Sequence, residues 1–270
     1  MRSNQYMPDT NRLSVLLSVI LLTYACLPYI KIPESSFNLS IFNVYIEYSF
    51  NISMLVYFIL SIFSAIGTDW LISDHPSKKR KQMYQHWLLP ALTAWVIGFP
   101  LSTIQVGLEW WAIFAFGAIL LTLVFISEYI AVDFKDQNFN IAAIGLTSVS
   151  LAMYLILIIS IRNLDPRLYI IFPAITLPLF LISLRTFYLY SRGKTKISWA
   201  IAITIIIGQF IAGLHYLPLS ARSFGIIAVA PSYALIRISV ALENQQKKKL
   251  VFIEPIIVMS LLFIVAIIIQ

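Results

Sequence analysis

Nine apolar stretches dominate this sequence, and each is long enough to cross a lipid bilayer. The hydrocarbon core of a bilayer is about 30 Å thick, so a spanning helix needs about 20 mostly apolar residues. The connections between the stretches are too short to form a water-soluble domain. We therefore predict an all-α integral membrane protein, with residues 1–270 forming a single transmembrane domain. The predicted spans are 13–30, 52–72, 87–106, 110–132, 141–161, 168–190, 197–214, 224–242 and 250–269.

The composition favours helices over a membrane β-barrel. Hydrophobic residues make up 60% of the chain and charged residues 11%, whereas soluble domains are roughly 25% charged. Strands of a barrel are segments of about ten residues with alternating polarity, but these stretches are continuously apolar. Helices satisfy every backbone hydrogen bond of such a segment in lipid. The sequence therefore predicts a polytopic helical bundle.

The basic residues predict the orientation of the chain. Loops on the cytoplasmic side of a membrane carry an excess of Lys and Arg. If the N-terminus is cytoplasmic, thirteen basic residues lie inside and four outside, so we predict a cytoplasmic N-terminus and an external C-terminus in the cell (cytoplasmic) membrane. The inside set is Arg2, Arg12, Lys78, Lys79, Arg80, Lys81, Lys135, Arg192, Lys194, Lys196, Lys247, Lys248 and Lys249, and the outside set is Lys31, Arg162, Arg167 and Arg222.

The run Lys78, Lys79, Arg80 and Lys81 has two interpretations. Such clusters attract anionic lipid headgroups at about 1 kcal/mol per basic residue near the surface, but membrane insertion needs the same charges as an orientation signal. The second interpretation is favoured. Nucleic acid is not an expected partner, because no basic surface interleaved with aromatic residues accompanies the run. The expected partners are the bilayer, anionic lipid headgroups and other membrane proteins.

The longest connection, residues 31–51, alternates between apolar and polar residues. A period of two and a high content of β-branched residues are typical of a strand or hairpin. Phe37, Ile41, Val44 and Tyr48 also fit the apolar stripe of a helix lying on the membrane surface. Both structures stay open at this stage, and in either case we expect the segment to cover the outer ends of the helices.

Charged residues inside the spans gather on one side of the predicted bundle. Asp69, Glu128, Arg185 and Arg237 lie near the cytoplasmic ends of the second, fourth, sixth and eighth spans. Ionisable residues within a membrane are costly and mark functional sites by default. Acids and bases at similar depth are expected to pair, because unpaired charges would face a low dielectric. Further members of this predicted polar layer are Asp74, His75, Asp133 and Asp136.

Three functions compete for the polar layer. In the leading one, acids and bases pair with each other and the chain is a non-catalytic scaffold or a subunit of a membrane assembly. In the first alternative the chain is a transferase or hydrolase acting on lipid-linked phosphate at the cytoplasmic face, with Mg²⁺ held by the acids and phosphate held by Arg185 and Arg237. In the second alternative the charges line a path for an ion or small solute. The candidate Mg²⁺ ligands are Asp69, Asp74, Glu128, Asp133 and Asp136.

No recognised motif decides among these functions. The sequence contains no phosphate-binding loop of the Walker type, no Gly-x-Ser-x-Gly elbow and no pair of histidines at metal-ligand spacing. No cofactor is therefore demanded, no catalytic residue is assigned, and Mg²⁺ is expected only under the first alternative. Discontinuous helices are the best sequence signal for transport. Pro173 and Pro178, five residues apart, predict an interruption of the sixth span.

Overall fold

The computed structural model describes residues 7–30, 35–41, 44–50, 52–73, 75, 84–165, 167–191, 193–245 and 249–270. These residues form nine α-helices, one short 3₁₀ turn (Leu27–Tyr29) and one two-stranded hairpin, which confirms the predicted helical bundle. The helices are α1 (Thr10–Cys26), α2 (Ile52–Ile72), α3 (Tyr84–Thr103), α4 (Leu108–Ile130), α5 (Phe139–Asn163), α6 (Leu168–Tyr190), α7 (Ile197–Leu214), α8 (Ala221–Glu243) and α9 (Lys249–Ile269).

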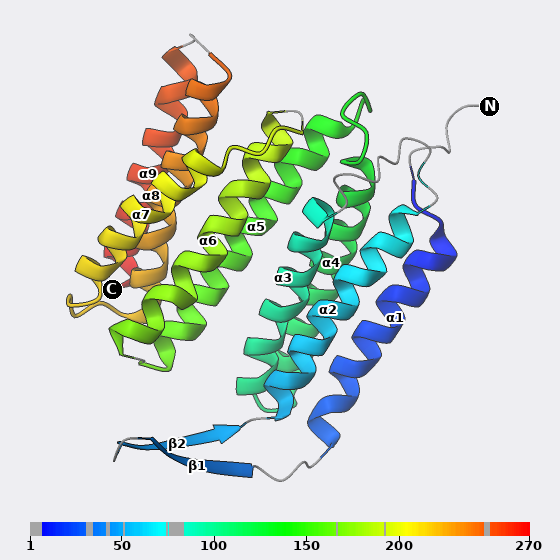
Figure 1. The fold of residues 1–270 in the computed structure, drawn as a ribbon, viewed down its shortest axis with the longest axis vertical. Coiled ribbons are helices and arrows are strands. Elements are labelled where there is room, and N and C mark those ends of the chain that lie inside the picture. The colour runs from blue at the N-terminus through cyan, green and yellow to red at the C-terminus, as the bar shows by residue number, and fades with distance from the viewer. Residues whose placement is uncertain are drawn as a thin grey trace.

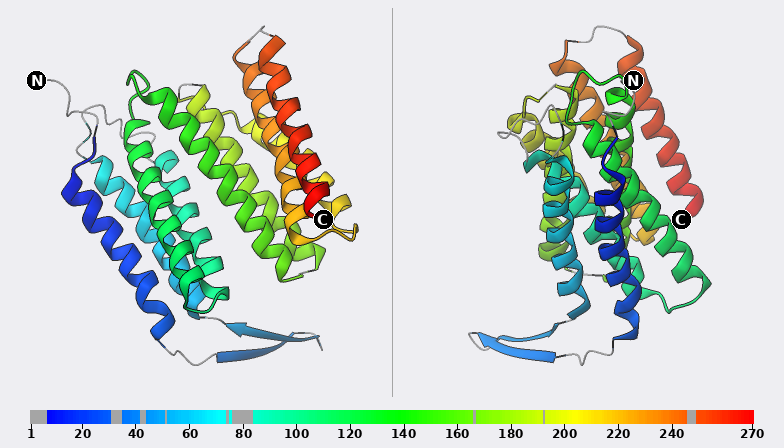
Figure 2. Two further views of the ribbon diagram at one scale, coloured as in Figure 1. Left: turned by 180° about the vertical axis from the view of Figure 1, so that it is seen from behind. Right: turned by 90° about the vertical axis from the view of Figure 1, so that its right-hand side faces the viewer.

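Successive helices run in alternate directions (Figure 1). Helices α1 to α4 form one side of the bundle, α7 to α9 form the other, and α5 and α6 lie between them, as the rear view in Figure 2 also shows. Helices α2, α4, α6 and α8 therefore finish at the same end, which we call the charged end. The opposite end, where the strands lie, is the hairpin end.

Eight of the nine helices are long and apolar enough to cross a membrane by length and composition, so a membrane-embedded protein is confirmed. The exception is α3, which has 20 residues but begins with the polar residues Gln85 and His86. This helix contacts α2, α4, α5 and α6, and Leu89, Ala94 and Val96 on it are fully buried. Because neighbouring helices cover α3, it needs less apolar surface than a lipid-facing helix.

The predicted interruption of the sixth span is wrong. Helix α6 is continuous from Leu168 to Tyr190 with Pro173 and Pro178 inside it. The turn that holds Pro173 packs closely on α7, where a Cβ atom on Gly208 would lie 3.1 Å from Cζ of Phe172 and 3.2 Å from Cγ2 of Thr176. This part of α6 is therefore a packing surface for α7, and the transport signal that the two prolines suggested is removed.

The segment 31–51 contains a β-hairpin rather than a surface helix. Strand β1 (Ser35–Ile41) pairs antiparallel with β2 (Val44–Phe50), in a register that runs from Ser35 opposite Phe50 to Ile41 opposite Val44. The period-two pattern of the sequence therefore outweighs the weaker helical stripe. The two strands project sideways from the ends of α1 and α2 (Figures 1 and 2), so the predicted covering of the outer helix ends is not seen for these strands.

Two apolar cores lie on the two sides of the bundle. One joins α1 to α4 and includes Ile20 and Phe125, and the other is built mainly from α5 to α8 and includes Phe224. A smaller cluster connects them near the charged end, with Leu89 of α3 and Leu189 of α6 among its members. The helices that carry the central charged residues meet at this connection.

Candidate functional site

A buried cluster of three ionisable residues lies near the charged end, at the junction of the two cores. Glu128 of α4 forms an ion pair with Arg185 of α6, whose Nη2 donates to Oε2 of the carboxylate. Nδ1 of His86, in the first turn of α3, lies 2.8 Å from the same oxygen. The three side chains are nearly inaccessible, since Glu128 is 0%, Arg185 1% and His86 5% exposed. Three helices are thus joined through one carboxylate oxygen.

The contacts assign the proton of His86. Nη2 of Arg185 also lies 3.3 Å from Nδ1 of His86, but a nitrogen that donates its hydrogen to Glu128 cannot accept one from Arg185. We assign the Nδ1–H tautomer to a neutral His86, because the guanidinium already balances the single carboxylate charge. The Arg185 guanidinium also lies 5.2 Å from the ring centroid of Tyr188, where the ring face attracts a cation. The cluster as a whole carries no net charge.

Not every polar atom of the cluster is satisfied. Among the described residues, Oε1 of Glu128 and both Nε and Nη1 of Arg185 have no hydrogen-bond partner. Desolvation of a buried ion pair is repaid only when its geometry is good and its remaining atoms are hydrogen-bonded. The cluster therefore contributes more to determining which helices pack together than to the net stability of the fold. Removal of only one of the two charged side chains would leave an uncompensated charge in the interior.

His75, Asp133 and Asp136 form the outer part of the polar layer. His75 follows α2 and is 4% exposed, with its ring edge on Tyr129 at 4.7 Å between centroids. Burial lowers the pKa of His75 below its ordinary value, although Asp133 and Asp136 act against this shift. Asp133 accepts a hydrogen bond from the backbone N–H of Lys135, and Asp136 from that of Asn138. Both acids thus stabilise turns in the loop between α4 and α5.

Arg237 lies apart from this cluster. Its Nη2 is 3.3 Å from Oε2 of Glu254 on α9, the hydroxyl of Tyr233 donates to the other Glu254 oxygen, and the guanidinium lies 5.4 Å from the ring centroid of Tyr190. The four residues expected in one layer therefore do not form a single group, because Glu128 pairs with Arg185 whereas Arg237 pairs with Glu254. Glu254 was missed by the sequence interpretation, although the short connection between α8 and α9 places it beside Arg237 when the hairpin is folded.

A third pair joins the start of α7 to the end of α8. Nζ of Lys196 lies 2.5 Å from Oε1 of Glu243, and Nε1 of Trp199 donates to Oε2 of Glu243 at 3.0 Å. Both charged side chains are partly exposed. Like the other two pairs, this one connects neighbouring helices at the charged end.

The remaining predicted residues are not brought together. Asp69 on α2 is partly buried, and no hydrogen bond or ion pair to its carboxylate is found within the described ranges. Asp74 and the run Lys78, Lys79, Arg80 and Lys81 lie outside the described residues. In the part of the chain that the structure describes, three or more His, Cys, Asp or Glu side chains do not meet in a group that could hold a metal ion.

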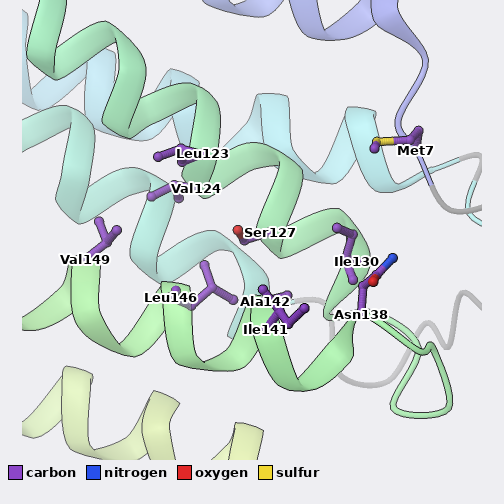
Figure 3. Close-up of a pocket in the computed structure, with 11 residues that line it drawn as sticks. Met7, Leu123, Val124, Ser127, Ile130, Asn138, Ile141, Ala142, Leu146 and Val149 are labelled. Carbon is purple, nitrogen blue, oxygen red and sulfur yellow. The ribbon is translucent and has the colours of Figure 1, made fainter.

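A groove of about 360 Å³ opens between α4 and α5 near the charged end (Figure 3). Leu123 of α4 and Leu146 and Val149 of α5 line it, together with the small residue Gly145. Its polar side chains are Ser127 and Asn138. None of the described residues that line this groove is charged, so they offer no carboxylate for a metal ion and no cation for a phosphate group.

Comparisons with known proteins assign the chain to a family but do not indicate its activity. The family model described as "Protein of unknown function (DUF5656)" matches residues 32–269, which is most of the chain. Searches of curated proteins and of solved structures each return no match.

Proposed function

We propose that this chain, which belongs to the DUF5656 family, is a non-catalytic scaffold or subunit of a membrane assembly. The observation that carries the proposal is the ion pair between Arg237 of α8 and Glu254 of α9. Both residues lie in helices able to cross a membrane, yet the Glu254 side chain is 46% exposed. Charged side chains at such positions normally face protein or water, and a protein neighbour on this face would cover the pair.

The position of α9 supports the same proposal. Only 11% of the α9 span is buried inside the protein, against 56% of the α8 span. Its packing is chiefly against α8, and the edge-on view of Figure 2 shows α9 at the outside of the bundle. Helices in lipid associate through close packing and interhelical hydrogen bonds. The α8–α9 face offers both a long apolar surface and a polar pair.

The buried cluster supports a structural role for the charged end. A shared Mg²⁺ site would need at least two of the predicted acids to converge with free oxygens. Glu128 instead directs one oxygen at Arg185 and His86, and Arg185 is thereby occupied. The same contacts fix the relative positions of α3, α4 and α6, as a scaffold requires.

The proposed orientation has a cytoplasmic N-terminus in the cell membrane, and reporter fusions test it. A reporter fused after Lys81 or after Gly193 is expected to be cytoplasmic, because the connections that contain these residues are rich in Lys and Arg. Fusions after Gly107 and after Gln270 are expected to be external. Activity of a cytoplasm-specific reporter at Gly107 but not at Lys81 would reverse the orientation.

The composition of the native particle tests the proposed assembly. The chain, extracted with its surrounding lipid in polymer discs, is expected to yield particles that hold more than one protein chain by native mass spectrometry. The exposed ion pair is then covered by that second chain. Particles that hold one 30.7 kDa chain and lipid alone would overturn the proposal.

A further inference from the structure

We infer that the protein neighbour on the α8–α9 face is a second copy of this chain, related by a twofold axis that runs along the helices. This inference rests on the proposed function and names the partner that it requires. The interface is centred on Arg237 and Glu254, and each Arg237 pairs with Glu254 of the partner copy. The protein is then a symmetric dimer in which four charged residues form one closed network.

The self-complementary charge of the face carries this inference. Arg237 and Glu254 are in contact, with 3.3 Å between Nη2 and Oε2, so the positive and negative groups lie at the same depth in the bundle. A twofold axis parallel to the helices keeps that depth and exchanges the two positions. It therefore places Arg237 of each copy beside Glu254 of the other copy, which gives two equivalent contacts. A partner with an unrelated sequence would need to supply both charges at that same depth.

The charge balance argues against lipid as the occupant. The cation of Arg237 is matched by the anion of Glu254, so the pair offers an anionic headgroup no net attraction. Hydrocarbon chains cannot hydrogen-bond to either group. A second ion pair of the same kind can, through charge-assisted hydrogen bonds, which are the strong ones in a low dielectric.

The outward face of α9 carries a continuous apolar strip. Below Glu254, Ile257, Leu261, Val265 and Ile268 follow at intervals of three and four residues, which places them on one face of the helix. All four are exposed, from 40% for Val265 to 77% for Ile268. Along the same twofold axis this strip meets its own copy. The charged network then lies at one end of a continuous apolar contact.

The first experiment compares the wild-type chain with a variant that lacks both charges. Arg237→Met with Glu254→Leu removes the network while leaving the long α8–α9 contact inside each chain. Native mass spectrometry from lipid discs is expected to give two-copy particles for the wild type and dimerisation weaker by about tenfold or more for the variant. Arg12→Met, a change to a basic residue at the opposite side of the bundle, is the control and is expected to stay dimeric.

The second experiment tests the exchange of charges between copies. Arg237→Glu and Glu254→Arg chains with different tags each place like charges on the face and are expected to form few homodimers. Co-expressed, they restore both opposite-charge contacts between chains but not within either chain, so heterodimers are expected in clear excess. Circular dichroism of each purified variant, in comparison with wild type, checks that the helices are retained.

The outcomes separate this inference from the proposed function. A wild-type particle with a different protein and no second copy would retain the assembly role but overturn the dimer. A single-chain particle would overturn both. The inference would also be overturned if the uncharged variant formed dimers as abundantly as the wild type. The same holds if the two charge-reversed variants formed homodimers and heterodimers in random proportion.

Discussion

Replacing Glu128 with Gln is expected to lower the free energy of unfolding by about 3–5 kcal/mol, the usual cost of removing one partner of a buried ion pair. Gln keeps the shape of the side chain but cannot balance the Arg185 charge, which is held at 1% exposure among apolar helices. His86 keeps a hydrogen-bond acceptor, so the loss comes mainly from the guanidinium. Unfolding in mixed detergent micelles, followed by circular dichroism, measures the change.

A matched acid-to-amide change serves as the control. Glu243→Gln affects a pair that is partly exposed, where solvent screens the charges, so its effect is expected to be clearly smaller. Equal losses for the two variants would contradict the assigned burial and pairing of Glu128.

A wholly apolar replacement distinguishes specificity from stability. The triple variant His86→Leu, Glu128→Leu and Arg185→Met removes all three members of the cluster together. Buried ion pairs replaced by apolar groups of similar volume are often neutral or stabilising, so most of the stability lost in Glu128→Gln is expected to return. A triple variant less stable than Glu128→Gln would mean that the cluster adds a large net stability itself.

The boundaries of the helices were well predicted where polar residues directly flank an apolar run. The second, sixth and seventh predicted spans coincide with α2, α6 and α7. The first residues of α1 and α8 were predicted too late, because these helices begin in polar sequence at side-chain caps. Asp9 accepts a hydrogen bond from the N–H of Asn11, and Ser220 accepts one from that of Ser223. A prediction based on apolar content does not detect a polar first turn whose backbone N–H group is capped by a side chain.

The pairing of the charged residues was predictable only in part. Residue positions along alternating helices define depth, and Glu128 and Arg185 do meet at similar depth. Depth does not define which helices are neighbours, however. Helix α8 contacts α5, α6, α7 and α9, so Arg237 pairs with Glu254 of the adjacent hairpin helix. His86 was not among the predicted members of the polar layer, because α3 had to be placed beside α4 before its contact with Glu128 could be seen.

The close approach of α2 and α3 leads to a second large effect, at Gly98. A Cβ atom built on Gly98 of α3 would lie 2.4 Å from Cγ and 2.7 Å from Cδ1 and Cδ2 of the Tyr57 ring on α2. Tyr57 is 6% exposed and its ring packs on Tyr24 of α1, so the ring has little room to move. Gly98→Ala is therefore expected to destabilise the protein by about 1–3 kcal/mol through overpacking.

The same substitution at Gly213 of α7 is expected to have the opposite sign. Apart from the local backbone of α7, no atom of the described residues lies within 4 Å of a Cβ built there, so only the helix propensity changes, and Ala is favoured over Gly by up to about 1 kcal/mol. Micelle unfolding of the two variants measures the difference.

Gly98→Ala combined with Tyr57→Leu should lower the free energy of unfolding by less than the sum of the two single changes, because the smaller side chain makes room for the new methyl group. Additive losses would contradict the contact between Gly98 of α3 and Tyr57 of α2. That contact also bears on the buried cluster, since α3 carries His86 to Glu128 and a displaced α3 would weaken that hydrogen bond.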